Sequence, residues 1–184
     1  MRIRMIPVKI AFAVMVSAVA TIPADAKEKE QSTMPSSETS GTNRAFSYEV
    51  TTTATAEQVW ALWTDVSTWK AWDKGLRDAE LAGPMQRGSK GKIISSSGST
   101  AVFEVTEFDP KRSYTFVTAL PLAKLTIRRT IVGASPTRFR HEVSFSGASA
   151  VVFANTLGPG FRKALPPTMR EIAAIAEGRS AQLP

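Results

Sequence analysis

The stretch ATAEQVWALWTDVSTWKAWDKGLRDAEL, residues 54–81, carries the strongest fold signal in this chain of 184 residues. Thr55 precedes a run of helix-forming residues, and Gln58 follows three positions later, which is the spacing of a capping box. The apolar positions of this run recur at helical spacing, and they are Val59, Trp60, Leu62 and Trp63. The sequence therefore predicts an amphipathic helix that begins after Thr55 and packs its tryptophans into a core.

A second, shorter helix is expected directly after the first one. Asp65 or Ser67 can cap its start, and Gly75 would end it. This helix carries Trp69 and Trp72. Because Trp72 lies near the helix end, we interpret it as a residue that could line a cavity, whereas the tryptophans of the first helix belong to the core.

Seven stretches with strand-like alternation surround these helices. One stretch, residues 45–53, precedes the helices, and turn-forming residues separate the six that follow. These six are residues 76–81, 89–97, 101–108, 113–120, 124–132 and 137–146. Strands at this regular spacing are typical of an antiparallel meander that closes partway to a barrel. We therefore predict an α+β fold with a seven-stranded, curved antiparallel sheet.

The last predicted element, residues 148–178, is one long but broken helix. Its apolar residues fall close to helical spacing, and they are Val152, Leu157, Phe161, Leu165, Met169, Ile172 and Ile175. Because proline lacks a backbone N–H, Gly158-Pro159-Gly160 and Pro166-Pro167 are expected to bend or interrupt the helix. We expect a packed part from Pro167 onward and a looser part before it. Gly158-Pro159-Gly160 is then either a flexible gate or a plain kink.

The N-terminal residues differ in composition from the rest of the chain. A basic start precedes an apolar run, residues 10–20, and Ala24-Asp25-Ala26 follows. This pattern is typical of a secretory signal peptide cleaved after Ala26, because the run is too short for a spanning helix. The sequence thus predicts a periplasmic or secreted protein. Its expected parts are a signal peptide, a disordered tether, a folded domain and a tail, over residues 1–26, 27–43, 44–178 and 179–184.

Composition excludes several classes of function. The chain has no cysteine and a single histidine, so we expect no disulfide, no thiolate chemistry, no metal site and no cofactor. The net charge is +7, but the basic residues are scattered, whereas a nucleic-acid footprint would be clustered. We therefore expect no nucleic-acid partner, and weak contact with an anionic membrane surface stays open.

Five motifs, taken in chain order, resemble one family. In residues 54–81, Asp65, Trp69 and Trp72 match the Asp, Trp and Trp of its first helices. The other four motifs are GPMQRGSKGKI, VTEFDPKRSYTF, SPTRFRHEVSFSG and FRKALPPTMREIAAIAE. Together they resemble the SRPBCC superfamily, which includes START domains, polyketide cyclases and pollen-allergen-type carriers. The resemblance implies a helix-grip fold, with a long C-terminal helix over a cavity that takes lipids, sterols, polyketides or aromatic molecules. It implies no catalytic residue.

Strand alternation assigns the inward faces of the last two strands. Pairing Ile131 with Phe139 sets apolar residues opposite one another and places Arg128 beside Glu142 on the outer face. A shift by one residue would mix the two faces. The favoured register, with a three-residue loop over residues 134–136, places Arg129 next to His141 on the inner face. These two residues could bind a ligand oxyanion, or they could lie at a wet rim with no special role.

The candidate ligand-binding residues are those expected to point between sheet and helix. They are Trp72, Phe103, Phe116, Leu125, Ile127, Arg129, Phe139, His141, Val143, Phe145, Phe161, Leu165 and Met169. No catalytic or metal-binding residue is among them. The expected partner is one apolar small molecule, which an inward arginine would favour as an anion.

Three functions remain open from the sequence. The first is a non-catalytic carrier or sensor of an apolar ligand. The second is a cyclase or dehydratase that uses Arg129, His141 or Tyr114 for proton transfer. The third is an interaction module with a closed core. A roomy interior would favour the carrier, a histidine bonded to a second titratable group would favour the enzyme, and a filled core would favour the module.

Overall fold

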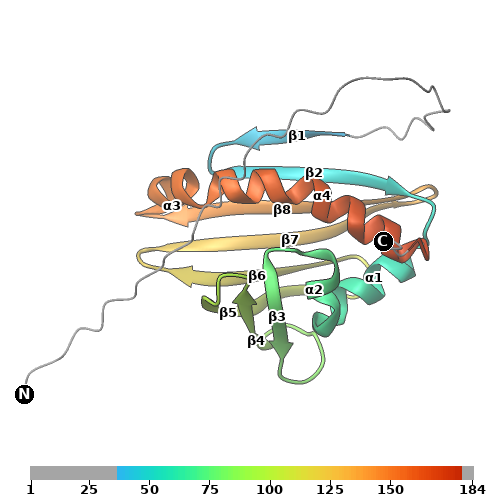
Figure 1. Ribbon diagram of the computed structural model, residues 1–184, viewed down its shortest axis with the longest axis horizontal. Helices are drawn as coiled ribbons and strands as arrows, with labels where there is room; N and C mark the ends of the chain where they lie inside the picture. The colour runs from blue at the N-terminus through green and yellow to red at the C-terminus, as the bar shows by residue number, and fades with distance from the viewer. Residues whose placement is uncertain (1–36, 180–184) are drawn as a thin grey trace, which may run out of the picture.

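The computed structural model describes residues 37–179, which form a two-layer α+β domain (Figure 1). All strand pairs of its single sheet are antiparallel, in the order β1-β2-β8-β7-β6-β5-β4-β3. The strands are β1 (Ser37–Thr42), β2 (Ala45–Thr52), β3 (Leu76–Leu81), β4 (Lys90–Ser95), β5 (Thr100–Asp109), β6 (Ser113–Leu120), β7 (Ala123–Ala134) and β8 (Thr137–Gly147). The α+β helix-grip fold predicted from the sequence is therefore confirmed.

The helices cover one face of this sheet. They are α1 (Ala56–Thr64), the 3-10 helix η1 (Val66–Thr68), α2 (Trp69–Trp72), α3 (Ala150–Thr156) and α4 (Gly158–Ala176). The long helix α4 lies along β2 and β8, with α3 at its start and α1 and α2 near its C-terminal end (Figure 1). The capping box at the start of α1 is confirmed, since Thr55 Oγ1 accepts from Gln58 N and Gln58 Oε1 accepts from Thr55 N.

The sheet has eight strands where the sequence predicted seven. The additional strand is β1, and it lies in residues that composition assigned to a disordered tether. Its backbone pairs with the edge of β2, with Thr42 opposite Ala45 and Gly41 opposite Phe46. Residues 37–42 of the predicted tether thus form an edge strand, and backbone hydrogen bonds to an open sheet edge do not require an apolar sequence. The predicted signal peptide, residues 27–36 and residues 180–184 lie outside the described residues.

The predicted register between the last two strands is confirmed. Ile131 pairs with Phe139 and Arg129 with His141, while Arg128 lies opposite Glu142 on the outer face. The predicted three-residue loop is wrong, because the two strands continue to Ala134 and Thr137 and leave a two-residue turn, Ser135-Pro136. A register shift between Ile131 and Gly133 absorbs the extra residue, as a bulge does.

The C-terminal segment is two helices, and its prolines behave differently from the expectation. The break falls at Leu157, between α3 and α4, and Pro159 occupies the first turn of α4, where its missing N–H costs nothing. Helix α4 continues through Pro166 and Pro167. Buried side chains on both sides of these prolines, Leu165 and Met169, press α4 onto the sheet, so tertiary packing maintains the helix there.

Helix α4 is too polar, and the remaining helices are too short, to cross a lipid bilayer within residues 37–179.

Candidate ligand-binding site between the sheet and α4

Two polar residues lie side by side in the interior, on neighbouring strands. Arg129 of β7 pairs with His141 of β8, and Tyr48 of β2 is the partner of His141 on its other side. Arg129 is 2% exposed and His141 is 6% exposed. The alternative that these two residues lie at a wet rim is therefore wrong. A full charge is held inside the fold.

Aromatic rings surround the Arg129 guanidinium. Its Cζ lies 4.4 Å from the centre of the Trp69 ring and 4.8 Å from that of Trp72. Tyr114 and Phe116 follow at 5.6 and 5.5 Å. Each such contact attracts a cation to the ring face, and more strongly where water is excluded. The two tryptophans come from α2 and the other two rings from β6, so the cage forms only when the second helix docks on the sheet.

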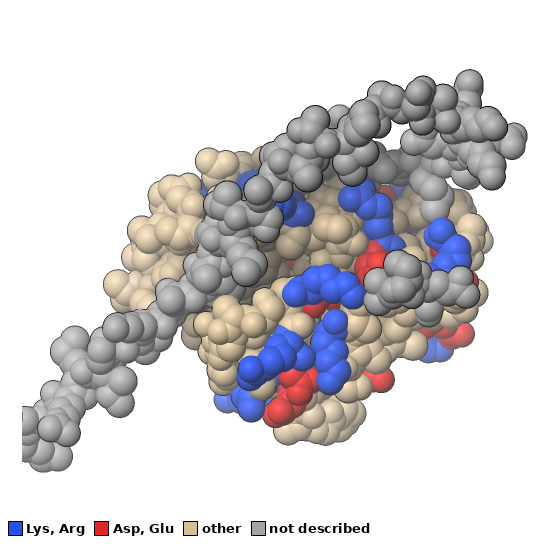
Figure 2. All heavy atoms as spheres, in the orientation of Figure 1, with Lys and Arg blue, Asp and Glu red and all other residues tan. Residues whose placement is uncertain are grey.

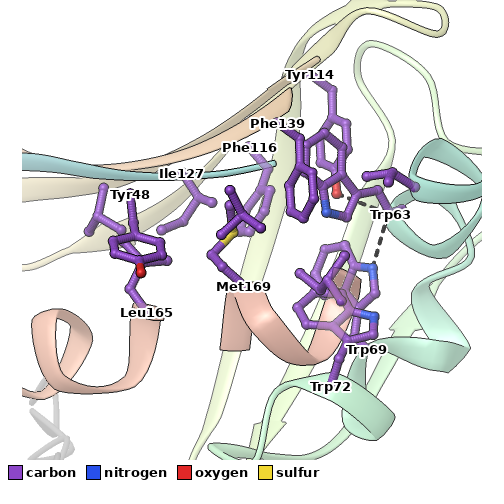
Figure 3. Close-up of a cluster of buried hydrophobic side chains, with 14 of the residues drawn as sticks. Tyr48, Trp63, Trp69, Trp72, Tyr114, Phe116, Ile127, Phe139, Leu165 and Met169 are labelled. Carbon is purple, nitrogen blue, oxygen red and sulfur yellow. Dashed lines mark hydrogen bonds between the residues drawn. The ribbon is translucent and has the colours of Figure 1, made fainter. Parts of the chain in front are cut away.

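Hydrogen bonds tie this cage to α1. The Arg129 Nη1 group donates to the Tyr114 hydroxyl, and the Tyr114 hydroxyl donates to the Trp63 carbonyl oxygen at 2.9 Å. The Trp69 indole Nε1 donates to the same carbonyl at 3.0 Å. Figure 3 shows both bonds converging on Trp63, with Trp69 and Trp72 side by side below.

Four nitrogens in this region are buried and have no hydrogen-bond partner among the described residues. They are Nε1 of Trp63, Nε1 of Trp72, Nε of Arg129 and Nδ1 of His141. Buried polar groups in proteins are nearly always paired, and each unpaired one costs about 1–3 kcal/mol. Arg129 also forms no ion pair within residues 37–179. The site thus holds uncompensated N–H groups and one positive charge.

Burial and the Arg129 charge shift the pKa values of the surrounding groups. Burial, reinforced by Arg129, holds the pKa of His141 well below its usual value, so this imidazole is neutral. Burial raises the pKa of Tyr114 to about 12, against the opposing effect of Arg129. Burial also raises the pKa of Asp73, against a hydrogen bond from the Gly75 N–H and attraction to Arg129. Asp73 is the acidic group that feels the Arg129 charge.

The apolar part of the site lies between β7, β8 and α4. Figure 3 shows Leu165 and Met169 reaching from α4 toward the sheet, where Tyr48 and Ile127 lie. Eleven of the thirteen predicted site residues are buried on this inner side, while Leu125 and Phe161 are partly buried and pack against the same core. Phe161 meets Phe145 edge to face, with ring centres 6.3 Å apart. The structure thus brings the predicted residues together around one interior.

Side chains occupy the space between the sheet and α4. Trp69 stacks on Phe103 and Phe116 with ring centres 5.5 and 5.4 Å away, and Met169 is fully buried. Two hollows on the described part of the chain lie elsewhere. One, of about 460 Å³, is on the outer face around Arg128 and Glu142, and the other, of about 580 Å³, lies where residues 51–57 meet residues 134–137. A ligand between sheet and α4 therefore requires side chains to move.

Sequence reasoning missed part of this site. Trp63, Trp69 and Asp73 were not among the predicted residues, and Tyr114 entered only as a candidate for proton transfer. The helical spacing of Trp63 predicts a core residue, and Trp69 is placed on the second helix without a role in the site. Asp73 carried no distinguishing signal, because its proximity to Arg129 depends on how α2 docks.

Comparison with known proteins agrees with the fold and defines the class of protein. The model of the family described as polyketide cyclase / dehydrase and lipid transport matches residues 44–177. This chain belongs to that family. A search of the curated proteins finds no match.

Solved structures with the same fold come from distant proteins. Protein jhp0584 from Helicobacter pylori has a TM-score of 0.62 and 15% identity, over 85% of this chain and 99% of that one. Protein Ms6760 from Mycobacterium smegmatis has a TM-score of 0.56 and 17% identity, over 77% and 96%. BexL, a di-domain ARO/CYC of the BE-7585A biosynthetic pathway, has a TM-score of 0.55 and 17% identity, over 78% of this chain and 52% of BexL. At these identities the likeness shows the fold alone.

Proposed function

We propose that this protein binds one apolar small molecule with an anionic group, between the sheet and α4. Arg129 and His141 receive the anionic group, and the aliphatic and aromatic side chains around Ile127 and Met169 receive the apolar body. Family membership supports a role in hydrophobic-ligand binding or cyclisation. The family description, polyketide cyclase / dehydrase and lipid transport, supports a polyketide or a lipid as the ligand class.

The observation that carries this proposal is the set of unpaired nitrogens around Arg129. Side chains fill the space between the sheet and α4, as in an interaction module with a closed core. Such a module would nevertheless gain little from a buried arginine without an ion-pair partner, since replacing buried charges by apolar groups is often stabilising. A ligand oxyanion can accept from Arg129 Nε and from the indole N–H of Trp72, both of which are buried and unpaired. Ligand binding would therefore give hydrogen-bond partners to N–H groups that are buried and unpaired in the free protein.

Binding is favoured over catalysis by the state of His141. A general acid or base usually lies within hydrogen-bond reach of a second polar group that orients it. His141 Nδ1 has no such partner among the described residues. Its low pKa, set by burial and by Arg129, also means that it cannot donate a proton as imidazolium near neutral pH.

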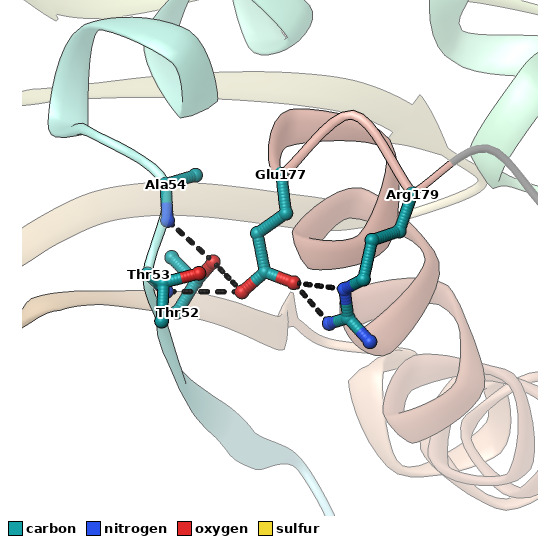
Figure 4. Close-up of polar contacts among 5 residues, drawn as sticks. All are labelled: Thr52, Thr53, Ala54, Glu177 and Arg179. Atoms are coloured by element: carbon teal, nitrogen blue, oxygen red, sulfur yellow. Dashed lines mark hydrogen bonds and ion pairs between the residues drawn. The ribbon is translucent and has the colours of Figure 1, made fainter.

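Access to the interior is proposed at the start of α4. The other end of α4 is fixed, because Glu177 Oε1 accepts from Thr52 Oγ1 at 2.6 Å and from Thr53 N at 2.9 Å (Figure 4). At the start, Gly160 has open space around it. A tilt of α4 about its fixed C-terminal end would separate Phe161 from Phe145 and expose the apolar part of the site.

A matched pair of fluorescent probes tests the proposal, namely cis-parinaric acid and its methyl ester. The acid is expected to bind with a stoichiometry near one and to bind more tightly than the ester. Arg129→Met should reduce that preference by roughly 10- to 100-fold, which is the value of a charge-assisted hydrogen bond. His141→Gln should reduce it less. Arg128→Gln is the matched control, since Arg128 is the next residue of β7 and lies on the outer face.

The alternatives predict other results. A closed-core module would show no saturable binding of either probe. A purely apolar site would bind acid and ester equally and would be indifferent to Arg129→Met. Loss of preference in Arg128→Gln as well would show that general surface charge attracts the acid, and it would refute a role for the interior.

A further inference from the structure

One end of the molecule exposes aliphatic side chains. Leu122, in the turn between β6 and β7, is 80% exposed. Val151 and Val152, in the first turn of α3, are 54% and 59% exposed. These three residues, with Pro121, are called the apolar tip below. Leu122, Val151 and Val152 are three of the four large hydrophobic residues that are exposed in the described part of the chain.

Two hydrogen bonds fix the β6–β7 turn to the start of α3 and so determine the geometry of the tip. Ser149 N donates to the Leu122 carbonyl oxygen at 3.2 Å, and Ser149 Oγ donates to the Pro121 carbonyl oxygen. Gly147 allows this approach, because a Cβ there would lie 2.6 Å from the Leu122 oxygen. The turn and the start of α3 therefore present their side chains together.

Leu122 occupies its position at a conformational cost. Its φ is +56°, in the left-handed region, where glycine and asparagine are favoured and a branched apolar residue is uncommon. Its side chain gains little from the fold, because most of it faces solvent. Strained, exposed apolar residues of this kind are typical of sites that contact something else.

The charge around the tip has one sign. The segments at this end are residues 119–125, around the β6–β7 turn, and residues 146–163, from the end of β8 through α3 to the start of α4, and they contain no aspartate or glutamate. They carry exposed Lys124, two positions after Leu122, and exposed Lys163 on α4. Figure 2 shows the end over α3 and the β6–β7 turn as largely uncharged, with basic residues on the adjoining surface.

We propose that the apolar tip docks on an anionic lipid surface. A few aliphatic side chains that protrude, with basic residues behind them and no acidic residue, fit insertion at a membrane interface combined with attraction to anionic headgroups. A stable protein partner would need a much larger surface, on the order of 1,000 Å² or more. This inference rests on the tip alone and is independent of what the interior binds.

The experiment uses the absence of cysteine from this chain, which makes any introduced cysteine unique. Leu122→Cys, Val152→Cys and Val102→Cys are each labelled with an NBD fluorophore in the full chain. Val102 is the matched control, because it is 61% exposed but lies on β5, outside the tip. With vesicles of equal parts phosphatidylglycerol and phosphatidylcholine, labels at 122 and 152 should shift their emission to the blue, and the label at 102 should not.

This readout is local, so the apolar run of residues 10–20 cannot produce the expected pattern by itself. The shift at 122 should weaken at high salt and with pure phosphatidylcholine vesicles. No shift at 122, or an equal shift at 102, would overturn the proposal. A shift at 122 that grows with protein concentration without vesicles would instead identify contact between two copies, and it would also overturn it.

A second variant confirms the role of the side chain itself. Leu122→Asn suits the left-handed backbone, so the fold should be retained or stabilised. Its partitioning to the anionic vesicles, measured by sedimentation, should fall by about tenfold relative to the parent chain, as expected when one leucine side chain no longer inserts. Val102→Asn should leave partitioning unchanged, and an equal loss in both variants would contradict a specific tip.

Discussion

Arg129 of β7 lies directly opposite His141 of β8, and both side chains are buried. A guanidinium fixed beside an imidazole in a water-excluded interior makes protonation of that imidazole costly. Burial and this neighbouring charge, in that order, lower the pKa of His141 well below its usual value of 6.5. The pair thus consists of a permanent cation and a neutral ring, which can offer one donor and one acceptor to a ligand.

The first prediction follows from this neutral histidine. The unfolded chain takes up a proton at His141 as the pH falls through 6.5, whereas the folded protein does not. The free energy of unfolding should therefore be fully retained above pH 6.5 and fall below it, by up to about 1.4 kcal/mol per pH unit. His141→Gln removes this proton uptake and should flatten the decline between pH 6.5 and 5, as measured by urea unfolding.

The contribution of His141 to the pH dependence of unfolding must be separated from the contributions of neighbouring groups. Tyr48 and Arg129 flank it on the neighbouring strands, and the raised pKa of Asp73 acts in the opposite direction. The difference between parent and His141→Gln cancels the Asp73 contribution, because both proteins keep that residue. Parallel pH profiles for the two proteins would contradict a neutral, buried His141.

The second prediction concerns the stability cost of Arg129. Methionine has a similar length, needs no hydrogen bond and can contact the same four rings. Arg129→Met should therefore raise the free energy of unfolding by about 1–3 kcal/mol, as replacements of buried charges often do. The measurement is urea unfolding at pH 7. A loss of more than 1 kcal/mol would show that the aromatic cage stabilises the fold through the cation, and it would make Arg129 a structural residue.

The sequence predicts most of the sheet and of the inward face because strand alternation has a fixed period. Phe139, His141 and Val143 must share one face of β8, and only one register with β7 keeps Ile127 and Ile131 opposite apolar partners. That reasoning placed Arg129 next to His141 without any tertiary information. The same reasoning could not predict the pairing of β1, because an edge strand held by backbone hydrogen bonds leaves no apolar pattern in the sequence.

The environment of Arg129 could not be predicted for a different reason. Trp69 and Trp72 approach it from α2, whose orientation on the sheet depends on packing between elements far apart in sequence. Whether the interior is hollow or filled is set in the same way, by the fit of Met169 and the tryptophans. Periodicity assigns a face to each residue, but it does not determine how much space remains between two faces.

The third prediction concerns Glu177, which joins the end of α4 to β2 (Figure 4). Burial alone raises the pKa of Glu177, but hydrogen bonds from Thr52, Thr53 and Arg179 outweigh it and lower the pKa to about 2. The stabilisation is therefore present above the unfolded pKa of 4.5 and lost as the pH falls from 4.5 toward 2. Glu177→Gln should cost about 1–2 kcal/mol at pH 7.

The pH dependence of this stability loss distinguishes the hydrogen bonds of the Glu177 carboxylate from a packing effect of the side chain. The difference in unfolding free energy between parent and Glu177→Gln should be constant between pH 6 and 8 and shrink below pH 4.5. Glu171→Gln, on the same helix, is the control and should change stability by less than about 0.5 kcal/mol. A difference that persists unchanged at pH 3 would mean that the charge of Glu177 is not what fixes α4.

The fourth prediction concerns the N-terminal residues. We propose that residues 1–26 are removed on export, because a basic start, a short apolar run and Ala24-Asp25-Ala26 follow one another. The intact mass of protein recovered from the periplasm or medium of a bacterial expression host should match a chain that begins at Lys27. Ala26→Pro should block this cleavage, and recovery of the uncleaved parent chain alone would contradict the proposed route.

The last prediction separates a gate from a kink at the start of α4. A Cβ added at Gly160 would meet no atom within 4 Å, and this glycine does not have a positive φ. Gly160→Ala should therefore stabilise the fold, by about 0.5–1 kcal/mol, since alanine is the better helix former. If α4 must tilt or fray here to admit a ligand, the same change should slow both association and dissociation of cis-parinaric acid in stopped-flow fluorescence. A plain kink would leave both rate constants at the parent values while the stability gain remained. Because the stability gain is expected in either case, it shows that the alanine is accommodated, and the rate constants alone decide whether ligand access passes through this junction.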